Sequence, residues 1–294
     1  MSAARAFRMP STPLSFSLEL FPPKTPEAIA RLPAVLKKLA GVQPAYFSVT
    51  YGAGGSSQDG TYDTLVRVAE ETGVEAAPHL TCVGSTRAGV KALLDKYHAA
   101  GVTRIVALRG DLPATSATPE APGEFRYANE LVEYVRQTHD AHFQIEVACY
   151  PEVHPQAPDA DADFANFARK VRAGADCALT QYFFNADAYF DFADRSARAG
   201  LGVPVIPGVM PITNFTQLVR FSDACGADIP RWIRRRLEQL QRDKAALLDF
   251  GLDVVTRLCD TLLRGGAPGL HFYTLNQSEP TLRLWKNLGL PAPV

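Results

Sequence analysis

Residues 15–20 read Ser15-Phe16-Ser17-Leu18-Glu19-Leu20, and this short run decides how the chain folds. Apolar and polar side chains alternate along it, which is typical of a strand with one apolar and one polar face. Seven further strand-like runs follow, at Ala45–Thr50, Glu75–Thr81, Arg104–Leu108, Gln144–Tyr150, Cys177–Phe183, Val203–Pro207 and Leu270–Tyr273. Because helix-length segments separate these runs, the pattern predicts an α/β protein whose parallel strands close into a (β/α)8 TIM barrel.

The segments between the strands have the composition and period of helices. They lie at Ala28–Ala40, Tyr62–Thr72, Ala88–Ala100, Tyr127–Thr138, Phe164–Ala173 and Ala186–Ala199. The connection from the seventh to the eighth strand is longer and predicts three extra helices, at Phe215–Ala224, Ile233–Leu248 and Leu252–Leu263. No linker-like break divides the chain, so we expect one catalytic barrel domain over residues 1–294, with residues 1–13 as a flexible tail. An open doubly wound sheet is the alternative, but no strand is followed by G-x-G-x-x-G.

The composition excludes several classes of protein. The 294 residues are 47% hydrophobic and 21% charged, and the formal net charge is −1, so we expect neither disorder nor binding to nucleic acid or anionic membrane. No apolar run reaches the roughly 18 residues that span a bilayer, and the first residues lack a secretory signal. Five cysteines without a C-x-x-C spacing argue against a disulfide framework or a zinc ribbon. We therefore expect a cytoplasmic protein without a bound metal.

Polar side chains gather at the carboxyl ends of the predicted strands. Barrel enzymes carry their chemistry at this rim, and the alternation of the first strand places Glu19 inside the barrel close to it. The other strand ends contribute Thr50, His79, Arg109 with Asp111, Tyr150 with His154, Gln181 and Tyr273. Seven of the eight strands thus end in a charged or hydrogen-bonding group, which predicts an active site at this rim.

Each residue taken alone also has a simpler interpretation. Glu19 is compatible with a buried carboxylate paired with a lysine or arginine, Asp111 with the cap of a turn, and His79 with a hydrogen-bonded core imidazole. The basic run from Arg231 to Arg236 is typical of a solvated or interface helix face. No strand ends in the lysine of a Schiff-base aldolase, and paired histidines of a metallohydrolase are absent from the first strand. A lumenal acid beside aromatic and glycine-rich segments suits a large planar cofactor or substrate.

Eight motifs together resemble the methylenetetrahydrofolate reductase family. They are Leu18–Lys24 (LELFPPK), Ser48–Ala53 (SVTYGA), Pro78–Cys82 (PHLTC), Ala107–Pro113 (ALRGDLP), Tyr150–Pro155 (YPEVHP), Thr180–Phe184 (TQYFF), Pro207–Pro211 (PGVMP) and His271–Asn276 (HFYTLN). They follow the family's order and spacing over about residues 15 to 290. The resemblance implies a barrel with bound FAD that reduces 5,10-methylenetetrahydrofolate to 5-methyltetrahydrofolate with NADH or NADPH, and so supplies methyl groups for methionine synthesis.

The resemblance implies catalytic roles for two carboxylates. Glu19 matches the general acid that protonates N10 of the folate and opens its bridged ring. Because an acid must hold its proton at neutral pH, we expect burial to raise the pKa of Glu19. Asp111 matches the carboxylate between flavin and pterin, whose negative charge favours hydride donation and stabilises the developing iminium.

The resemblance also implies contacts for the cofactor and for both substrates. The FAD contacts are Tyr51, Ala53, His79, Arg109, Gly110, Asp111, Ala128, Tyr150, His154, Ala157, Asp163, Asn166, Arg169 and Lys170, with Thr50 on the nicotinamide side. The substrate contacts are Glu19, Asp111, Gln181, Gln217, Phe221, Tyr273 and Gln277. Because both substrates stack on the same flavin face in this family, ping-pong kinetics are expected.

The chain departs from the family at one position of the folate site. After Asn276 the family usually has an arginine, and this chain has Gln277. A neutral amide loses the charge-assisted pairing with a carboxylate of the folate tail. Arg283, or the arginines between Arg231 and Arg236, are candidates to replace that charge.

Three other functions remain open from the sequence. One is a different flavin barrel, such as one that oxidises proline, and another is the same folate reaction run oxidatively. The third is a folate-binding barrel without flavin or turnover. The sequence leaves the choice between NADH and NADPH open, together with the number of subunits, for which we expect a homo-oligomer.

Overall fold

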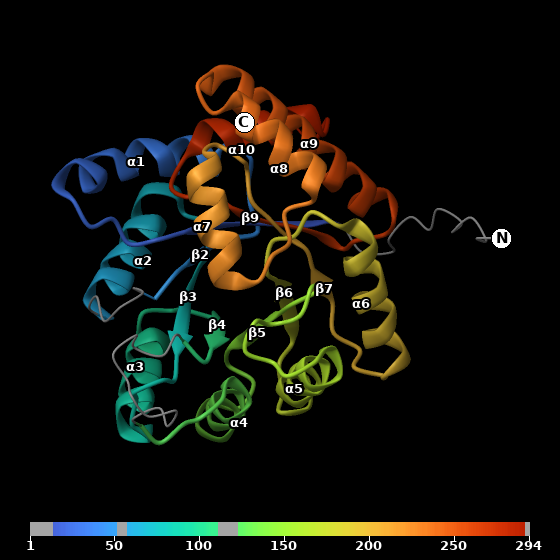
Figure 1. The fold of residues 1–294 in the computed structure, drawn as a ribbon. Coiled ribbons are helices and arrows are strands. Elements are labelled where there is room, and N and C mark those ends of the chain that lie inside the picture. The colour runs from blue at the N-terminus through green and yellow to red at the C-terminus, as the bar shows by residue number, and fades with distance from the viewer. Residues whose placement is uncertain (1–13, 52–57, 111–122, 292–294) are drawn as a thin grey trace.

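The computed structural model describes residues 14–51, 58–110 and 123–291, and within them helices surround a ring of parallel strands (Figure 1). The strands are β1 (Ser15–Leu20), β2 (Tyr46–Val49), β3 (Ala76–Thr81), β4 (Arg104–Leu108), β5 (Gln144–Cys149), β6 (Cys177–Thr180), β7 (Val205–Ile206), β8 (Gly208–Val209) and β9 (Gly269–Tyr273). The helices that alternate with them are α1 (Pro26–Ala40), α2 (Gln58–Thr72), α3 (Arg87–Ala99), α4 (Ala128–His139), α5 (Ala160–Arg172) and α6 (Ala186–Arg198). The predicted (β/α) barrel is confirmed.

The ring closes at Pro207, which divides the predicted seventh strand into β7 and β8. The strand order is β7-β6-β5-β4-β3-β2-β1-β9-β8, with β7 hydrogen-bonded to β6 and β8 to β9. Proline has no N–H to continue a ladder, so the chain changes its partner strand there. The next residue must be small, because a Cβ on Gly208 would lie 2.2 Å from the carbonyl oxygen of Thr180. The predicted strand Val203–Pro207 is therefore two short strands that join the two ends of the sheet.

As predicted from the sequence, the side chains of β1 alternate between the hydrophobic core and the lumen of the barrel. Leu18 and Leu20 are fully buried in the hydrophobic core cluster. Glu19 points the other way, and its Cα is in register with Ser48 on β2 and Tyr273 on β9. The core lies mostly between the strands and the helices, and the lumen holds a buried set of polar side chains.

Three helices occupy the long connection before β9, as predicted, but with different boundaries. They are α7 (Phe215–Cys225), α8 (Arg231–Leu240) and α9 (Lys244–Arg264). The break falls before Lys244, where the side chain of Asp243 caps α9, and not near Gly251. Gly251 lies inside α9, where a Cβ would come within 2.4 Å of the carbonyl oxygen of Ile212. This glycine allows close packing and does not end a helix.

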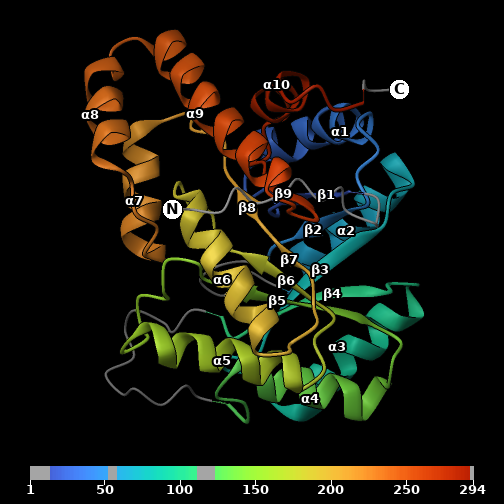
Figure 2. The same ribbon diagram turned by 90° about the vertical axis from the view of Figure 1, so that its right-hand side faces the viewer.

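The added helices extend one end of the barrel. Figure 2 shows α7 and α8 projecting beyond the strands, while α9 runs back along the barrel towards α1 and α10 (Ser278–Asn287). Helix α10 was not predicted from the sequence. Among the described residues, no helix is both long and apolar enough to span a membrane.

Candidate active site at the mouth of the barrel

Two histidines that are far from Glu19 in the sequence contact the predicted acid. Nε2 of His79, on β3, lies 3.3 Å from Oε2 of Glu19, and Nε2 of His271, on β9, lies 3.5 Å from the same oxygen. Both imidazoles are buried, and the side chain of Glu19 is 17% exposed. His79 was predicted as a cofactor contact, and its ring is here a partner of Glu19. Within the described residues, the ionisable side chains paired with Glu19 are these two histidines, and no lysine or arginine pairs with it.

The two histidines reverse the direction in which the pKa of Glu19 was expected to shift. Burial, the largest single contribution, raises the pKa of Glu19, as the sequence suggested. The hydrogen bonds and positive charges of His271 and His79 outweigh burial and lower this pKa to about 2. The prediction that Glu19 has a raised pKa is therefore wrong for the ligand-free site, because the sequence could not show that two imidazoles reach the same oxygen.

A cavity of about 280 Å³ opens above Glu19 at the carboxyl ends of the strands. We call it the acid pocket, and its lining includes Glu19, Gln181, Phe221, Tyr273 and Leu275. The hydroxyl of Tyr273 donates to the carbonyl of Thr180 at 2.7 Å, which holds this ring in the wall. Four predicted substrate contacts, Glu19, Gln181, Phe221 and Tyr273, therefore meet in one cavity.

A row of buried polar groups continues from His271 down the lumen, away from the mouth. Nδ1 of His271 lies 2.7 Å from Oγ of Ser17, and the ring of His271 stacks on that of Tyr46 with centroids 6.5 Å apart. Tyr46 donates to Oε2 of Glu146 at 2.6 Å, and the other oxygen of Glu146 accepts from Arg104 at 2.8 Å. Ser17 and His271 were expected from the sequence to lie on polar strand faces, but Tyr46, Arg104 and Glu146 were not singled out.

The predicted cofactor contacts after β4 and β5 lie close to one another. The guanidinium of Arg109 donates to Oε1 of Gln156 at 2.6 Å, and the rings of Tyr150 and His154 are 4.5 Å apart. Asp163, on α5, accepts from the backbone N–H of His154 at 3.0 Å. The amino group of Lys170 donates to the carbonyl of Ala148. Burial lowers the pKa of Lys170, and the nearby charge of Asp163 raises it.

Other predicted contacts lie near this group or outside the described residues. Gly110 has φ +88°, and a Cβ there would lie 3.0 Å from the side chain of Thr81, so only glycine fits without strain. Ala157 donates its N–H to the carbonyl of His154, Asn166 accepts from Arg169, and Ala128 begins α4. Thr50 follows β2 and Tyr51 lines a separate cavity beside Thr81. The predictions for Ala53, Asp111 and the tail 1–13 fall outside the described residues.

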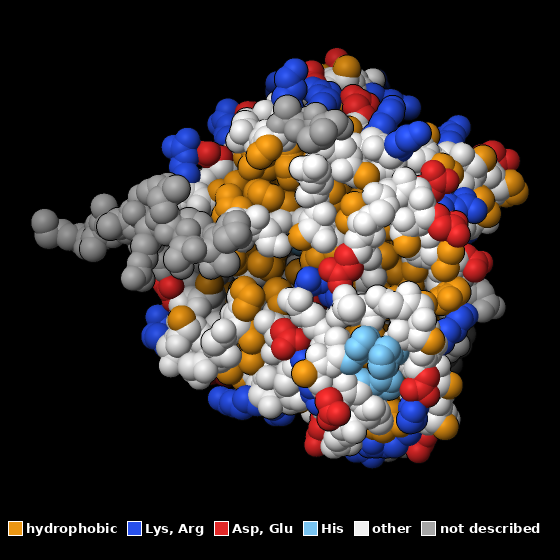
Figure 3. All heavy atoms as spheres, turned by 180° about the vertical axis from the view of Figure 1, so that it is seen from behind, with side chains coloured by type: hydrophobic (Ala, Val, Ile, Leu, Met, Phe, Trp, Pro, Cys, Tyr) orange, Lys and Arg blue, Asp and Glu red, His pale blue; other side chains and the backbone are white. Residues whose placement is uncertain are grey.

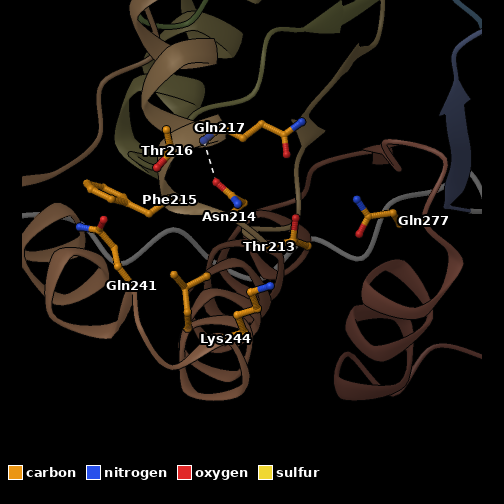
Figure 4. A pocket seen from close by; sticks show the side chains of 9 residues that line it. Thr213, Asn214, Phe215, Thr216, Gln217, Gln241, Lys244 and Gln277 are labelled. Carbon is orange, nitrogen blue, oxygen red and sulfur yellow. Dashed lines mark hydrogen bonds between the residues drawn. The ribbon is translucent and has the colours of Figure 1, made fainter. Parts of the chain in front are cut away.

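A second cavity, of about 350 Å³, holds the remaining predicted substrate contacts. We call it the amide pocket, because Gln217, Gln241 and Gln277 line it together with Asn214 and Lys244. Figure 4 shows these side chains reaching into the space from α7, from the α8–α9 connection and from the starts of α9 and α10. Gln217 lies one helical turn before Phe221 of the acid pocket, and Gln277 follows Leu275 of that pocket by two residues. The two cavities are therefore neighbours along the same helix and loop.

The loop that joins the two pockets has an unusual backbone conformation, which hydrogen bonds hold in place. Leu275 and Asn276 have φ values of +51° and +54°, which residues with a Cβ seldom adopt. The side chain of Asn276 holds this turn by accepting from the N–H of Phe21 at 3.1 Å and donating to its carbonyl at 2.8 Å. The turn directs Leu275 to the acid pocket and Gln277 to the amide pocket.

The cation of the amide pocket is Lys244, a residue that was not predicted as part of the site. Lys244 is the one charged residue among the described residues that line this pocket, and no hydrogen bond or ion pair joins it to a described residue. Arg283, the expected replacement, instead pairs with Asp249 at 2.6 Å. The arginines from Arg231 to Arg236 do not line the pocket either, and Arg235 pairs with Glu238. The sequence could not have placed Lys244 in this pocket, because only the folded structure shows that the start of α9 lies beside Gln277.

Comparison with known proteins adds an independent observation. The sequence profile of the family described as "Methylenetetrahydrofolate reductase" matches residues 6–289. The 5,10-methylenetetrahydrofolate reductase of Salmonella typhimurium is 40% identical over 277 residues, which are 94% of this chain and 91% of that protein. The protein of the same name from Escherichia coli is 39% identical over the same shares. "Methylenetetrahydrofolate reductase (NADH) 1" of Arabidopsis thaliana is 33% identical over 94% of this chain and 48% of its own length.

Superposition on a solved structure supports the barrel fold. A Clostridium thermocellum protein that binds two copies of 5-methyl-5,6,7,8-tetrahydrofolic acid superposes with a TM-score of 0.69, covering 94% of this chain and 95% of that one, at 15% identity. At this identity the likeness concerns the barrel alone. The match over nearly the whole sequence, the close relatives and the motifs assembled at the mouth lead to one conclusion: the chain belongs to the methylenetetrahydrofolate reductase family.

Proposed function

We propose that this chain reduces 5,10-methylenetetrahydrofolate to 5-methyltetrahydrofolate, with FAD as cofactor and NADH or NADPH as the reductant. The observation that carries the proposal is a carboxylate with two imidazole partners at the base of the acid pocket, where Gln181 offers a carboxamide to the substrate. The reaction consumes one proton in addition to a hydride, so the site needs a group that holds and delivers a proton. Glu19 with its two histidines meets this need.

Glu19 acts as the general acid in this proposal. In the ligand-free site Glu19 is an ionised carboxylate, because its pKa is lowered to about 2, and the proton for N10 is proposed to reach it through a neighbouring imidazole. When N10 of the folate approaches, the carboxylate passes a proton from an imidazole to N10, and the C–N10 bond of the bridged ring breaks. The products of this step are an N5 iminium on the substrate, an unchanged carboxylate and one neutral imidazole, so the proton is accounted for.

The remaining walls of the acid pocket orient the pterin. Gln181 presents both a donor and an acceptor, which match the edge of a pterin ring. Phe221, Tyr273 and Leu275 provide apolar surface for a planar ring system and exclude water from the iminium. Asp111 is proposed as the second carboxylate of the site on the basis of the family resemblance alone.

The group of residues after β4 and β5 fits a flavin dinucleotide. Arg109 and Lys170 bring positive charge to neighbouring positions, as two phosphates require, and Gly110 leaves room for close approach to the backbone. Tyr150 and His154 add aromatic surface next to these cations. Bound FAD would supply the relay of hydride between the nicotinamide and the folate, in a ping-pong sequence.

The amide pocket would accept the glutamate tail of the folate. The tail leaves the pterin through an aminobenzoyl ring and ends in carboxylates, so it carries negative charge away from the acid pocket. Gln217 and Gln277 offer neutral donors along that direction, and Lys244 offers the unpaired cation. Lys244 lies in the first turn of α9, where a positive charge is unfavourable for the helix dipole, so helix stability does not explain this lysine.

Anaerobic titration of the purified protein tests the proposed function. We expect a yellow protein whose flavin absorbance is bleached by NADH or NADPH and restored by methylenetetrahydrofolate. Titration with each nicotinamide separately also decides the choice of reductant. Bleaching by proline without a response to folate would indicate a proline-oxidising barrel, and a colourless protein that takes up no FAD would indicate a folate-binding barrel without turnover.

A further inference from the structure

The pairing of β1 with β9 continues past the ends of both strands through a side chain. In the ladder, Glu19 is the last residue of β1 in register with β9, opposite Tyr273. Two residues further along β1, the N–H of Phe21 donates to the carboxamide of Asn276 at 3.1 Å, and the same carboxamide donates to the carbonyl of Phe21 at 2.8 Å. A backbone amide offers the same donor and acceptor, so Asn276 takes the place of a strand partner.

Thr274 joins the same turn to the backbone of the acid itself. Its hydroxyl donates to the carbonyl oxygen of Glu19 at 2.6 Å, and its backbone N–H donates to the same oxygen at 3.3 Å. The hydroxyl oxygen of Thr274 also accepts from the N–H of Asn276 at 3.2 Å. Because Thr274 is buried, water does not compete for these hydrogen bonds. The turn from Thr274 to Asn276 and the segment from Glu19 to Phe21 therefore form one connected unit.

This unit reaches both pockets, and one part of it has an unfavourable backbone. Glu19, Phe21 and Leu275 line the acid pocket, and Gln277 lines the amide pocket. Leu275 and Asn276 both have left-handed φ values, which persist only where surrounding contacts hold them. The hydrogen bonds to the end of β1 hold one side of this turn. A ligand that contacts Gln277 would hold the other side.

We propose that Asn276 is a positioning residue for acid catalysis: through it, a substrate tail bound at Gln277 in the amide pocket holds Glu19 in place for proton delivery in the acid pocket. This inference rests on the proposed function, in which Glu19 is the acid and the amide pocket accepts the tail. Binding of a remote part of the substrate then raises the rate of the chemical step as well as the affinity. Asn276 is not among the residues that line either pocket.

Helix α7 also reaches both pockets, through Gln217 and Phe221, but it is built differently. It is a continuous helix whose first turn is capped by the side chain of Asn214. It ends at Gly226, where glycine suits the left-handed backbone. Such a helix is stable without a ligand, whereas the turn at Leu275 depends on its contacts. The turn is therefore the element whose conformation a bound tail would stabilise.

The Asn276→Gly variant of the FAD-loaded protein tests the inference. Glycine adopts a left-handed backbone without penalty, so this change removes the carboxamide and keeps the turn accessible. The limiting rate of flavin reoxidation is measured with methylenetetrahydrofolate and with a substrate that lacks glutamate. In the wild type the tail should raise this limiting rate by about threefold or more. In Asn276→Gly the limiting rates with the two substrates should lie within about twofold of each other, although the tail still improves affinity.

A second measurement needs no turnover. p-Aminobenzoylglutamate, the part of folate beyond the pterin, serves as a probe for the amide pocket. In the wild type it should slow hydrogen exchange of the Phe21 amide, which donates to Asn276, and mass spectrometry detects this change. In Asn276→Gly the probe should leave this exchange unchanged. Thr274→Val keeps the shape of the side chain and removes the hydroxyl that donates to Glu19, so it should also reduce the effect of the tail on the limiting rate.

Asn185→Gly is the matched control. The side chain of Asn185 caps α6 by accepting from the N–H of Asp187 at 3.0 Å, and it lines neither pocket. This variant should keep both effects of the tail. All rates are compared at one pH, because histidines gather on one face of the molecule, where the ring of His98 lies 3.7 Å from that of His142 and 6.0 Å from that of His139 (Figure 3). Protonation there would add repulsion that is unrelated to the site.

Three results would overturn the inference. They are a wild-type limiting rate that does not depend on the tail, a tail effect that is unchanged in Asn276→Gly, and a probe that alters exchange of Phe21 equally in the wild type and in Asn276→Gly. Failure of the proposed function has a different signature, because the wild type would then show no folate half-reaction with either substrate. The exchange measurement would still decide in that case, and no slowing in the wild type would overturn the inference.

Discussion

The acid pocket and the amide pocket share a helix and a loop, yet they are built in opposite ways. In the acid pocket, Glu19 is nearly enclosed and two imidazoles from other strands fix its carboxylate. In the amide pocket, Lys244 is exposed and has no partner among the described residues. A proton transfer requires reacting atoms at fixed positions, whereas a flexible anionic tail needs only charge within reach. We therefore propose that the acid pocket carries the chemistry and that the amide pocket influences which form of substrate binds well.

The largest effect is expected in the acid pocket. Glu19→Gln keeps the shape of the side chain and removes its ability to pass a proton. The folate half-reaction should slow by roughly 10²- to 10⁴-fold, and reduction by the nicotinamide should remain close to wild type. Stopped-flow absorbance of the flavin measures both steps separately. An equal loss in both half-reactions would mean that Glu19 is not the acid.

The two pockets should also differ in how much their charged residues make the stability of the protein depend on pH. The pKa of Glu19 is lowered to about 2 in the folded protein, so its contribution to stability is complete above the ordinary carboxylate range. It is lost as the pH falls from about 5 towards 2, and it amounts to about 3 kcal/mol. Urea unfolding of wild type and Glu19→Gln across this range should show a steeper loss in the wild type. Lys244→Ala should leave the slope unchanged, and parallel slopes for all three proteins would contradict the assignment.

A smaller effect is expected from the cation of the amide pocket. Lys244→Ala removes the charge that would pair with a tail carboxylate, so KM for methylenetetrahydrofolate should rise roughly 3- to 10-fold with little change in kcat. Lys244→Arg should retain most of the affinity. Arg283→Ala is the matched control, since Arg283 pairs with Asp249 outside the pocket. The difference between wild type and Lys244→Ala should vanish with a substrate that lacks glutamate, and its persistence there would exclude the tail as the partner.

The smallest effect should come from adding a charge to the same pocket. Gln277→Arg places a second cation opposite Lys244, and KM for the folate should fall by roughly 2- to 5-fold. If both residues bind the same carboxylates, the effects of Gln277→Arg and Lys244→Ala should not add. A double-mutant cycle on KM measures this coupling. Strict additivity would show that the two side chains contact different parts of the substrate.

Much of the fold was predictable because it depends on local pattern. The alternation in β1 gave the face on which Glu19 lies, and the repeated spacing of strands and helices gave the barrel. Errors arose where packing overrides local preference. Gly251 resembles a helix end in the sequence, but it lies inside α9 because the backbone of Ile212 passes too close for a side chain.

The electrostatics of the site were not predictable, because they depend on residues far apart in the chain. Glu19 and His271 are separated by 252 positions, and only closure of the barrel brings them to 3.5 Å. A sequence shows that a carboxylate will be buried, which raises its pKa, but it does not show which imidazoles face it. The sequence by itself determined the barrel and the family and predicted Glu19 as the acid, since these follow from periodicity and contiguous motifs. Only the tertiary structure decided the ionisation of that acid and the place of Lys244, because electrostatic interactions depend on distances in space.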